Sequence, residues 1–124
     1  MKSHNIVHVE LAAQDRKALG KFYSNVFGWE LMDIDDMNYT TFKAGDCIGG
    51  GFNPVTQQNP AGTVTVYIDT DDVTASLKQV EMAGGTILVP ETEIPNTGKF
   101  GIFRDPQGNM IGLYKAYPMM NQPM

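Results

Sequence analysis

The chain has 124 residues, 42% of them hydrophobic, and a net charge of −5. This length and composition predict one folded domain with a modest core and argue against a disordered chain. The acidic balance argues against nucleic acid or an anionic membrane as a partner, because both attract basic surfaces. The single cysteine, Cys47, excludes an internal disulfide. No apolar run approaches membrane-spanning length and no signal peptide is evident, so we expect a cytoplasmic protein.

The first half of the chain predicts a strand, a helix and three further strands. Residues 5–11 alternate between apolar and polar side chains, which is the period of a half-buried strand. A helix is expected near 15–27, with Asp15 as its N-terminal cap and Gly28 as its stop. Residues 29–34, 38–44 and 47–52 then read as short strands between turn-prone segments.

The second half repeats this order after a linker at 54–62 that contains two prolines and a glycine. It predicts a strand at 63–69, a helix near 72–83 with Asp71 or Asp72 as its cap, and strands at 86–94, 99–105 and 109–115. A shift of 57 residues places 6–32 on 63–89 without a gap, with seven identities in 27 positions. The sequence therefore predicts two βαβββ modules, at 5–53 and 63–117, and one such unit needs a second to cover its sheet.

The repeated βαβββ order, together with two motifs, resembles the vicinal oxygen chelate superfamily, also called the glyoxalase/bleomycin-resistance/dioxygenase family. The motifs are "FYSNVFGWEL" at the end of the first helix and "DPQGN" before the last strand. The resemblance implies an α+β fold in which two βαβββ modules form a curved mixed sheet around a cavity. It covers nearly the whole chain, from Asn5 to about Tyr117.

The resemblance also locates the places where metal-dependent members of the family hold their ion. Their four ligands, usually His and Glu, come from the first strand and a late strand of each module. Carried over, these positions are His8, Thr65, Gly112 and either Gly49 or Gly50. Only His8 is a usual ligand, and one histidine does not hold a catalytic ion. We therefore expect a metal-free branch without a cofactor, in which Gly112 leaves space in the cavity.

Strand alternation predicts which side chains line that cavity. Val7, Val9 and Leu11, with Val64, Val66 and Ile68, are expected to pack on the helices, and the opposite faces to bind a ligand. The residues proposed to bind the ligand are His8, Glu10, Trp29, Thr65, Tyr67, Gly112 and Tyr114. Five of them have a second interpretation: Trp29, Tyr67 and Tyr114 as half-buried packing residues, and His8 with Glu10 as a proton-transfer pair.

These observations favour a metal-independent protein that binds a small organic molecule, to sequester or sense it as the antibiotic-binding relatives do. The first alternative is an enzyme, of the lyase, isomerase or dioxygenase type, with a degenerate metal site. The second is an accessory module for protein association. A homodimer is expected, because two-fold dimers are the commonest soluble oligomers and the modules have sheet edges to cover.

Overall fold

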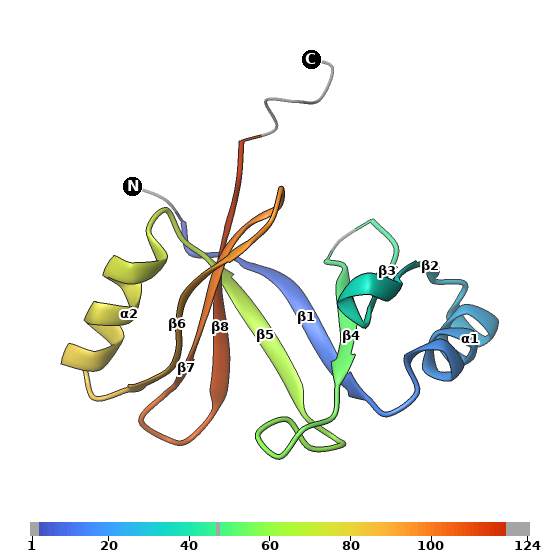
Figure 1. The fold of residues 1–124 in the computed structure, drawn as a ribbon, viewed down its shortest axis with the longest axis horizontal. Helices are drawn as coiled ribbons and strands as arrows, with labels where there is room; N and C mark the ends of the chain where they lie inside the picture. The colour runs from blue at the N-terminus through green and yellow to red at the C-terminus, as the bar shows by residue number, and fades with distance from the viewer. Residues whose placement is uncertain (1–2, 47, 119–124) are drawn as a thin grey trace. The chain divides into compact units, whose positions relative to one another are not determined.

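A computed structural model describes residues 3–46 and 48–118, and it contains the two βαβββ modules that the sequence predicts. Figure 1 shows the order of the elements along the chain. The first series is β1 (Ile6–Ala13), α1 (Arg16–Phe27), β2 (Glu30–Ile34), β3 (Tyr39–Lys43) and β4 (Gly50–Pro54). The second is β5 (Val64–Asp69), α2 (Val73–Met82), β6 (Thr86–Ile94), β7 (Gly98–Arg104) and β8 (Met110–Ala116). The predicted α+β fold with eight strands is confirmed for the described residues.

The chain separates into two compact units, which are described one at a time. The first unit is Val7–Val66, and the second consists of the described residues from Tyr67 onward together with 3–6. The boundary falls inside β5, so the module bounds of 5–53 and 63–117 stay a prediction. Among the described helices, none has both the length and the apolar character needed to cross a membrane.

The two units use the same strand order. In the first, the order is β2-β3-β4-β1, with β1 parallel to β4 and the other neighbours antiparallel. In the second, the order is β5-β8-β7-β6, with β5 parallel to β8 and the other neighbours antiparallel. Each parallel pair therefore brings the first and last strand of its series together.

Both helices begin and end where the sequence predicts. The carboxylates of Asp15 and Asp72 accept hydrogen bonds from the backbone N–H groups of Ala18 and Ala75, at 3.0 and 2.9 Å. Such caps satisfy donors that the first helical turn leaves unpaired. Gly28 ends α1 in the left-handed conformation, with φ of 71°. One short element was not predicted: residues 35–37 form a 3-10 helix, η1 (Asp35–Met37), where a turn was expected.

Each unit has its own hydrophobic core between its helix and its strands. In the first, α1 packs on β2, β3 and β4, and the buried residues are Ala13, Phe42 and Phe52. In the second, α2 packs on β6, β7 and β8, and the buried residues are Val73, Leu77, Phe103 and Leu113. Leu11 and Ile68 join these cores as predicted. The prediction was wrong for Val7 and Val64, which are 37% and 58% exposed because they precede the part of each strand that meets its core.

Candidate functional site

A hydrogen-bonded cluster of His8, Tyr39 and Glu10 lies on one face of the first unit. His8 and Glu10 are two residues apart on β1, so their side chains leave the strand on the same face. The hydroxyl of Tyr39, on β3, lies 2.8 Å from Nε2 of His8 and donates to Oε2 of Glu10 at 2.9 Å. The cluster therefore joins an imidazole and a carboxylate through one phenol.

The direction of these bonds follows from the chemistry of the three groups. A carboxylate only accepts, and the Tyr39 hydroxyl has one proton, which goes to Glu10. The Tyr39 oxygen is then the acceptor of a proton on Nε2 of His8. Burial lowers the pKa of His8 below its usual value, and the Glu10 carboxylate, 3.9 Å away, opposes part of this shift. The lowered pKa favours the neutral imidazole, and the bond to Tyr39 favours the tautomer with its proton on Nε2.

Asn53 on β4 extends the cluster toward the end of the strand. Its Nδ2 donates to Oε1 of Glu10 at 3.0 Å, so both carboxylate oxygens of Glu10 accept a hydrogen bond. The Oδ1 of Asn53 is buried and has no hydrogen-bond partner among the described residues. A buried amide oxygen in this state is disfavoured by about 1–3 kcal/mol.

Strand register identifies the glycine in each unit that lies at the position where the resemblance implies an acid in metal-dependent members. On β4 the partner of Glu10 is Gly51, and on β8 the partner of Tyr67 is Gly112. Because the shift of 57 places Glu10 on Tyr67, Gly51 is the equivalent of Gly112. This corrects the sequence-based assignment to Gly49 or Gly50, which a pattern of three consecutive glycines could not resolve.

Both glycines are covered by a tyrosine ring from within their own unit. A Cβ atom added to Gly51 would overlap the ring and hydroxyl of Tyr39, and one added to Gly112 would overlap the ring of Tyr67. Tyr67 is itself only 8% exposed. The prediction that Gly112 leaves open space was therefore wrong, since the ring of Tyr67 occupies it.

These residues do not fit a metal ion of the kind that the resemblance implies. His8 is the one usual ligand at these positions, and Gly51 and Gly112 offer no ligand atom. Within residues 3–46 and 48–118, no three His, Cys, Asp or Glu side chains gather in a way that could hold an ion. The absence of a metal in the protein stays a prediction.

The other predicted site residues lie in different surroundings. Thr65 belongs to the first unit and is 2% exposed, with no partner for its Oγ1 among the described residues. Trp29 stacks between Tyr23 and Phe42, with ring centroids 4.6 and 4.5 Å away, and so joins the core that also contains Leu11. Trp29 therefore has the packing role that was its second interpretation. A contact between Trp29 and a ligand stays a prediction.

Tyr114 lies on β8 in the second unit and is half-buried. Its hydroxyl donates to the carbonyl oxygen of Thr97 at 3.4 Å. Burial, and then the nearby Asp69 carboxylate, raise the pKa of this phenol above its usual value. Tyr114 is therefore protonated at neutral pH and able to donate a hydrogen bond.

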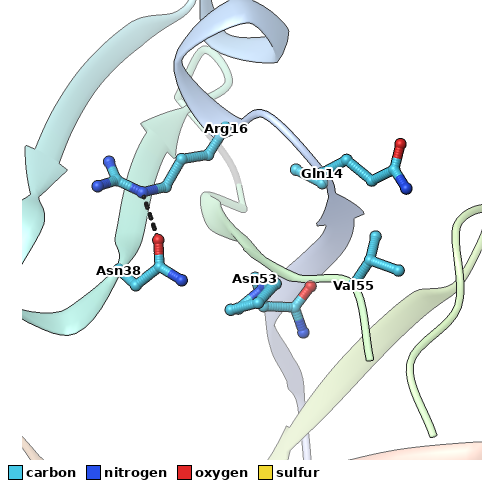
Figure 2. A pocket seen from close by; sticks show the side chains of 7 residues that line it. Gln14, Arg16, Asn38, Asn53 and Val55 are labelled. Atoms are coloured by element: carbon cyan, nitrogen blue, oxygen red, sulfur yellow. Dashed lines mark hydrogen bonds between the residues drawn. The ribbon is translucent and has the colours of Figure 1, made fainter. Parts of the chain in front are cut away.

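A pocket of about 430 Å³ opens in the first unit beyond Asn53. Figure 2 shows Gln14, Arg16, Asn38, Asn53 and Val55 around it. The complete lining is Ala13, Gln14, Arg16, Asn38, Asn53, Pro54 and Val55. The pocket thus combines one cation, three carboxamides and three apolar residues, and its volume suits a small organic molecule.

Arg16 is fixed in the wall of this pocket by four polar neighbours. Its Nη2 donates to Asp35 at 2.8 Å and its Nη1 donates to Thr40 at 3.0 Å. Nη1 also lies 3.4 Å from the Asp33 carboxylate, and Nε donates to Oδ1 of Asn38 at 3.2 Å. Hydrogen bonds from Arg16 and Lys17 lower the pKa of Asp35. These contacts hold the guanidinium in place, and the carboxylates of Asp33 and Asp35 balance its charge.

Sequence reasoning missed Tyr39, Asn53 and Arg16. Tyr39 begins a strand whose face could not be assigned without its register against β4. The Arg16 contacts depend on η1 and on the left-handed Asn38, with φ of 50°. The only available signal was the "DDMN" segment, which was interpreted as a plain turn.

A family model matches residues 5–113 of the chain, and its description is the glyoxalase/bleomycin resistance protein/dioxygenase superfamily. The chain belongs to this superfamily. Its relatives include the anthracycline biosynthesis protein DnrV of Streptomyces peucetius, 27% identical over 86% of this chain and 45% of that protein. The putative glyoxylase CFP32 of Mycobacterium bovis is 30% identical over 78% of this chain and 38% of that protein.

The chain thus spans about half the length of these curated relatives. Among solved structures, a hypothetical protein of Bacillus halodurans C-125 has a TM-score of 0.73. It is 13% identical, and the match covers 99% of both chains. This likeness supports the fold and leaves the function to be argued from the site.

Proposed function

We propose that this member of the superfamily binds a small organic molecule without a metal ion. The observation that carries the proposal is the pair of glycines covered by tyrosine rings. Gly51 and Gly112 stand where metal-dependent relatives would have acids, and Tyr39 and Tyr67 fill the space that an acid side chain and an ion would need. His8 is then the one usual ligand at the positions that the resemblance implies, and one imidazole does not hold a catalytic ion.

The binding role is supported by the pocket and by the polar cluster that adjoins it. Asn53 belongs to both, because it lines the pocket and donates to Glu10. A pocket with apolar walls and a few fixed polar groups is the usual form of a small-molecule site. The name of DnrV connects that relative with anthracycline biosynthesis, so polycyclic aromatic compounds are reasonable first ligands to test.

The proposal is tested by thermal unfolding against a panel of metabolites and drugs, including an anthracycline, in the presence and absence of EDTA. A ligand that binds the folded state raises the melting temperature by mass action. We expect at least one compound to do so equally with and without EDTA. Stabilisation that disappears with EDTA, or a panel without any stabilising compound, would count against the proposal.

A second candidate is an enzyme of the lyase, isomerase or dioxygenase type. The observation that favours it is the chain of hydrogen bonds from His8 through Tyr39 to Glu10, which is suited to moving a proton. If this chain acts on a degenerate metal site, activity and a bound ion should both disappear in His8→Ala. The leading proposal expects no ion in either protein.

We also propose a homodimer in the cytoplasm, with no nucleic acid or membrane as a partner. Phe22, Val26 and Phe27 on α1 are 53%, 56% and 64% exposed, and a second copy of the chain would cover such a surface. Sedimentation at tens of micromolar should show a dimer, which Val26→Glu with Phe27→Glu should dissociate. The control is Met82→Glu on α2, where the side chain is 82% exposed. A wild-type monomer would refute the dimer.

A further inference from the structure

We propose that the pocket beside Arg16 recognises an uncharged carboxamide group of the ligand. This inference rests on the proposed function and assigns a chemical class to the ligand at that site. The pocket lies wholly in the first unit and is lined by Gln14, Arg16, Asn38 and Asn53, with Ala13, Pro54 and Val55 as its apolar part. The preference for an uncharged carboxamide follows from three properties of the lining: its charge, its available donors and its unsatisfied acceptor.

The charges around the pocket favour a neutral ligand. Arg16 is the only charged residue in the lining, and its guanidinium already contacts the carboxylates of Asp33 and Asp35 at 3.4 and 2.8 Å. Lys17 also pairs with Asp35, at 3.3 Å, so two cations face two carboxylates. An anion therefore gains little from Arg16, and a cation finds no carboxylate in the lining to pair with.

The hydrogen-bonding groups are complementary to a carboxamide. The Oδ1 of Asn38 accepts from Nε of Arg16 at 3.2 Å, which fixes the side-chain amide so that its Nδ2 is the donor left for a ligand carbonyl. Asn53 is fixed in the opposite sense, because its Nδ2 donates to Glu10. Its Oδ1 is the buried acceptor without a partner among the described residues, and a ligand N–H that reaches it from the pocket would satisfy it.

A group that carries a carbonyl and an N–H side by side supplies both the acceptor that Asn38 lacks and the donor that Asn53 lacks. A carboxylate would repel the Oδ1 of Asn53, because both are acceptors, and an amidinium would repel Arg16 and offer Asn38 a donor where it needs an acceptor. The apolar part of the pocket, Pro54 and Val55, then accommodates the hydrocarbon attached to the amide.

Three isosteric probes test the inference: benzamide, benzoate and benzamidine, which are neutral, anionic and cationic. Each is titrated into the isotope-labelled full chain, and amide and side-chain NMR signals are followed. We expect benzamide to shift the side-chain signals of Asn38 and Asn53 and the Nε–H signal of Arg16. Its affinity should exceed that of either charged probe by about tenfold or more, the ratio that one mismatched hydrogen-bonding group in a site commonly produces.

Two variants separate this pocket from other places where benzamide might bind. Val55→Trp fills the pocket, whereas Gln57→Trp, on an exposed residue of the same loop, is its matched control. Asn38→Asp keeps the acceptor for Arg16 and removes the donor, so benzamide affinity should fall by about tenfold. Asp also tolerates the left-handed backbone of position 38.

The inference is overturned if benzamide leaves the three side-chain signals unchanged, if benzoate or benzamidine binds as well as benzamide, or if Val55→Trp binds benzamide as the wild type does. Any of these results together with a stabilising compound in the thermal panel would leave the proposed function standing. Failure of the panel as well would remove both.

Discussion

The parallel strand pairs β1 with β4 and β5 with β8 have the same backbone arrangement but different side chains around it. Both place a glycine on the last strand under a tyrosine ring: Gly51 under Tyr39, and Gly112 under Tyr67. Tyr39 comes from β3 and bonds to both His8 and Glu10, whereas Tyr67 lies on β5 itself, directly opposite its glycine. Equivalent backbone positions thus support a polar cluster in the first unit and a buried ring in the second.

The largest effect on stability is expected when an acid replaces the glycine of the second unit, Gly112. In Gly112→Glu, the new side chain would overlap the ring of Tyr67 and bury a carboxylate. We expect a loss of about 3 kcal/mol or more in the free energy of unfolding, measured with urea. The matched control is Ala116→Glu, on an exposed residue of the same strand, which should lose little. Equal stability of Gly112→Glu and the wild type would contradict the filled site.

A smaller loss is expected when only a methyl group is added under each ring. Gly51→Ala and Gly112→Ala should each destabilise the fold by about 1–3 kcal/mol, the usual range for overpacking. Double-mutant cycles with Tyr39→Ala and Tyr67→Ala should recover part of this loss, because each partner ring is then gone. Strict additivity in either cycle would show that the tyrosine ring is not the reason why a larger residue is disfavoured at the glycine.

The polar cluster of the first unit should depend on one hydroxyl group. Tyr39→Phe keeps the ring over Gly51 and leaves His8 and Glu10 without their common partner, so we expect a loss of about 1–2 kcal/mol in stability. The control is Tyr23→Phe, in the aromatic part of the core, which should change stability less. If both variants lose the same amount, the hydroxyl of Tyr39 has no special part in the cluster.

The smallest effect concerns pH. Burial lowers the pKa of folded His8, so the unfolded chain, with a His pKa of about 6.5, binds more protons between the two values. Stability should therefore be fully present above pH 6.5 and fall as the pH is lowered through this window. His8→Gln should lose this component of the slope. Glu10→Gln should lower the pKa of His8 further, as followed by NMR, because the opposing carboxylate charge is removed; a rise would contradict the assignment.

Sequence alone predicted the elements that depend on local chemistry. Asp15 marked one helix start and Gly28 its stop, and the other start was narrowed to Asp71 or Asp72, of which the structure uses Asp72. The site was predicted only in part, since its contacts join strands that are distant in sequence. His8 and Glu10 were found through their alternation on β1. Choosing Gly51 among three neighbouring glycines required the pairing with Glu10, and the role of Tyr39 required the position of β3.

Elemental analysis of the untagged protein tests the central claim of metal-independent binding most directly. Purification without chelators and without a histidine tag keeps any native ion and adds no artificial site. The account predicts Zn, Ni, Fe and Mn far below one equivalent per chain, and no difference between the wild type and His8→Ala. One equivalent of any of these metals, lost in His8→Ala, would contradict it.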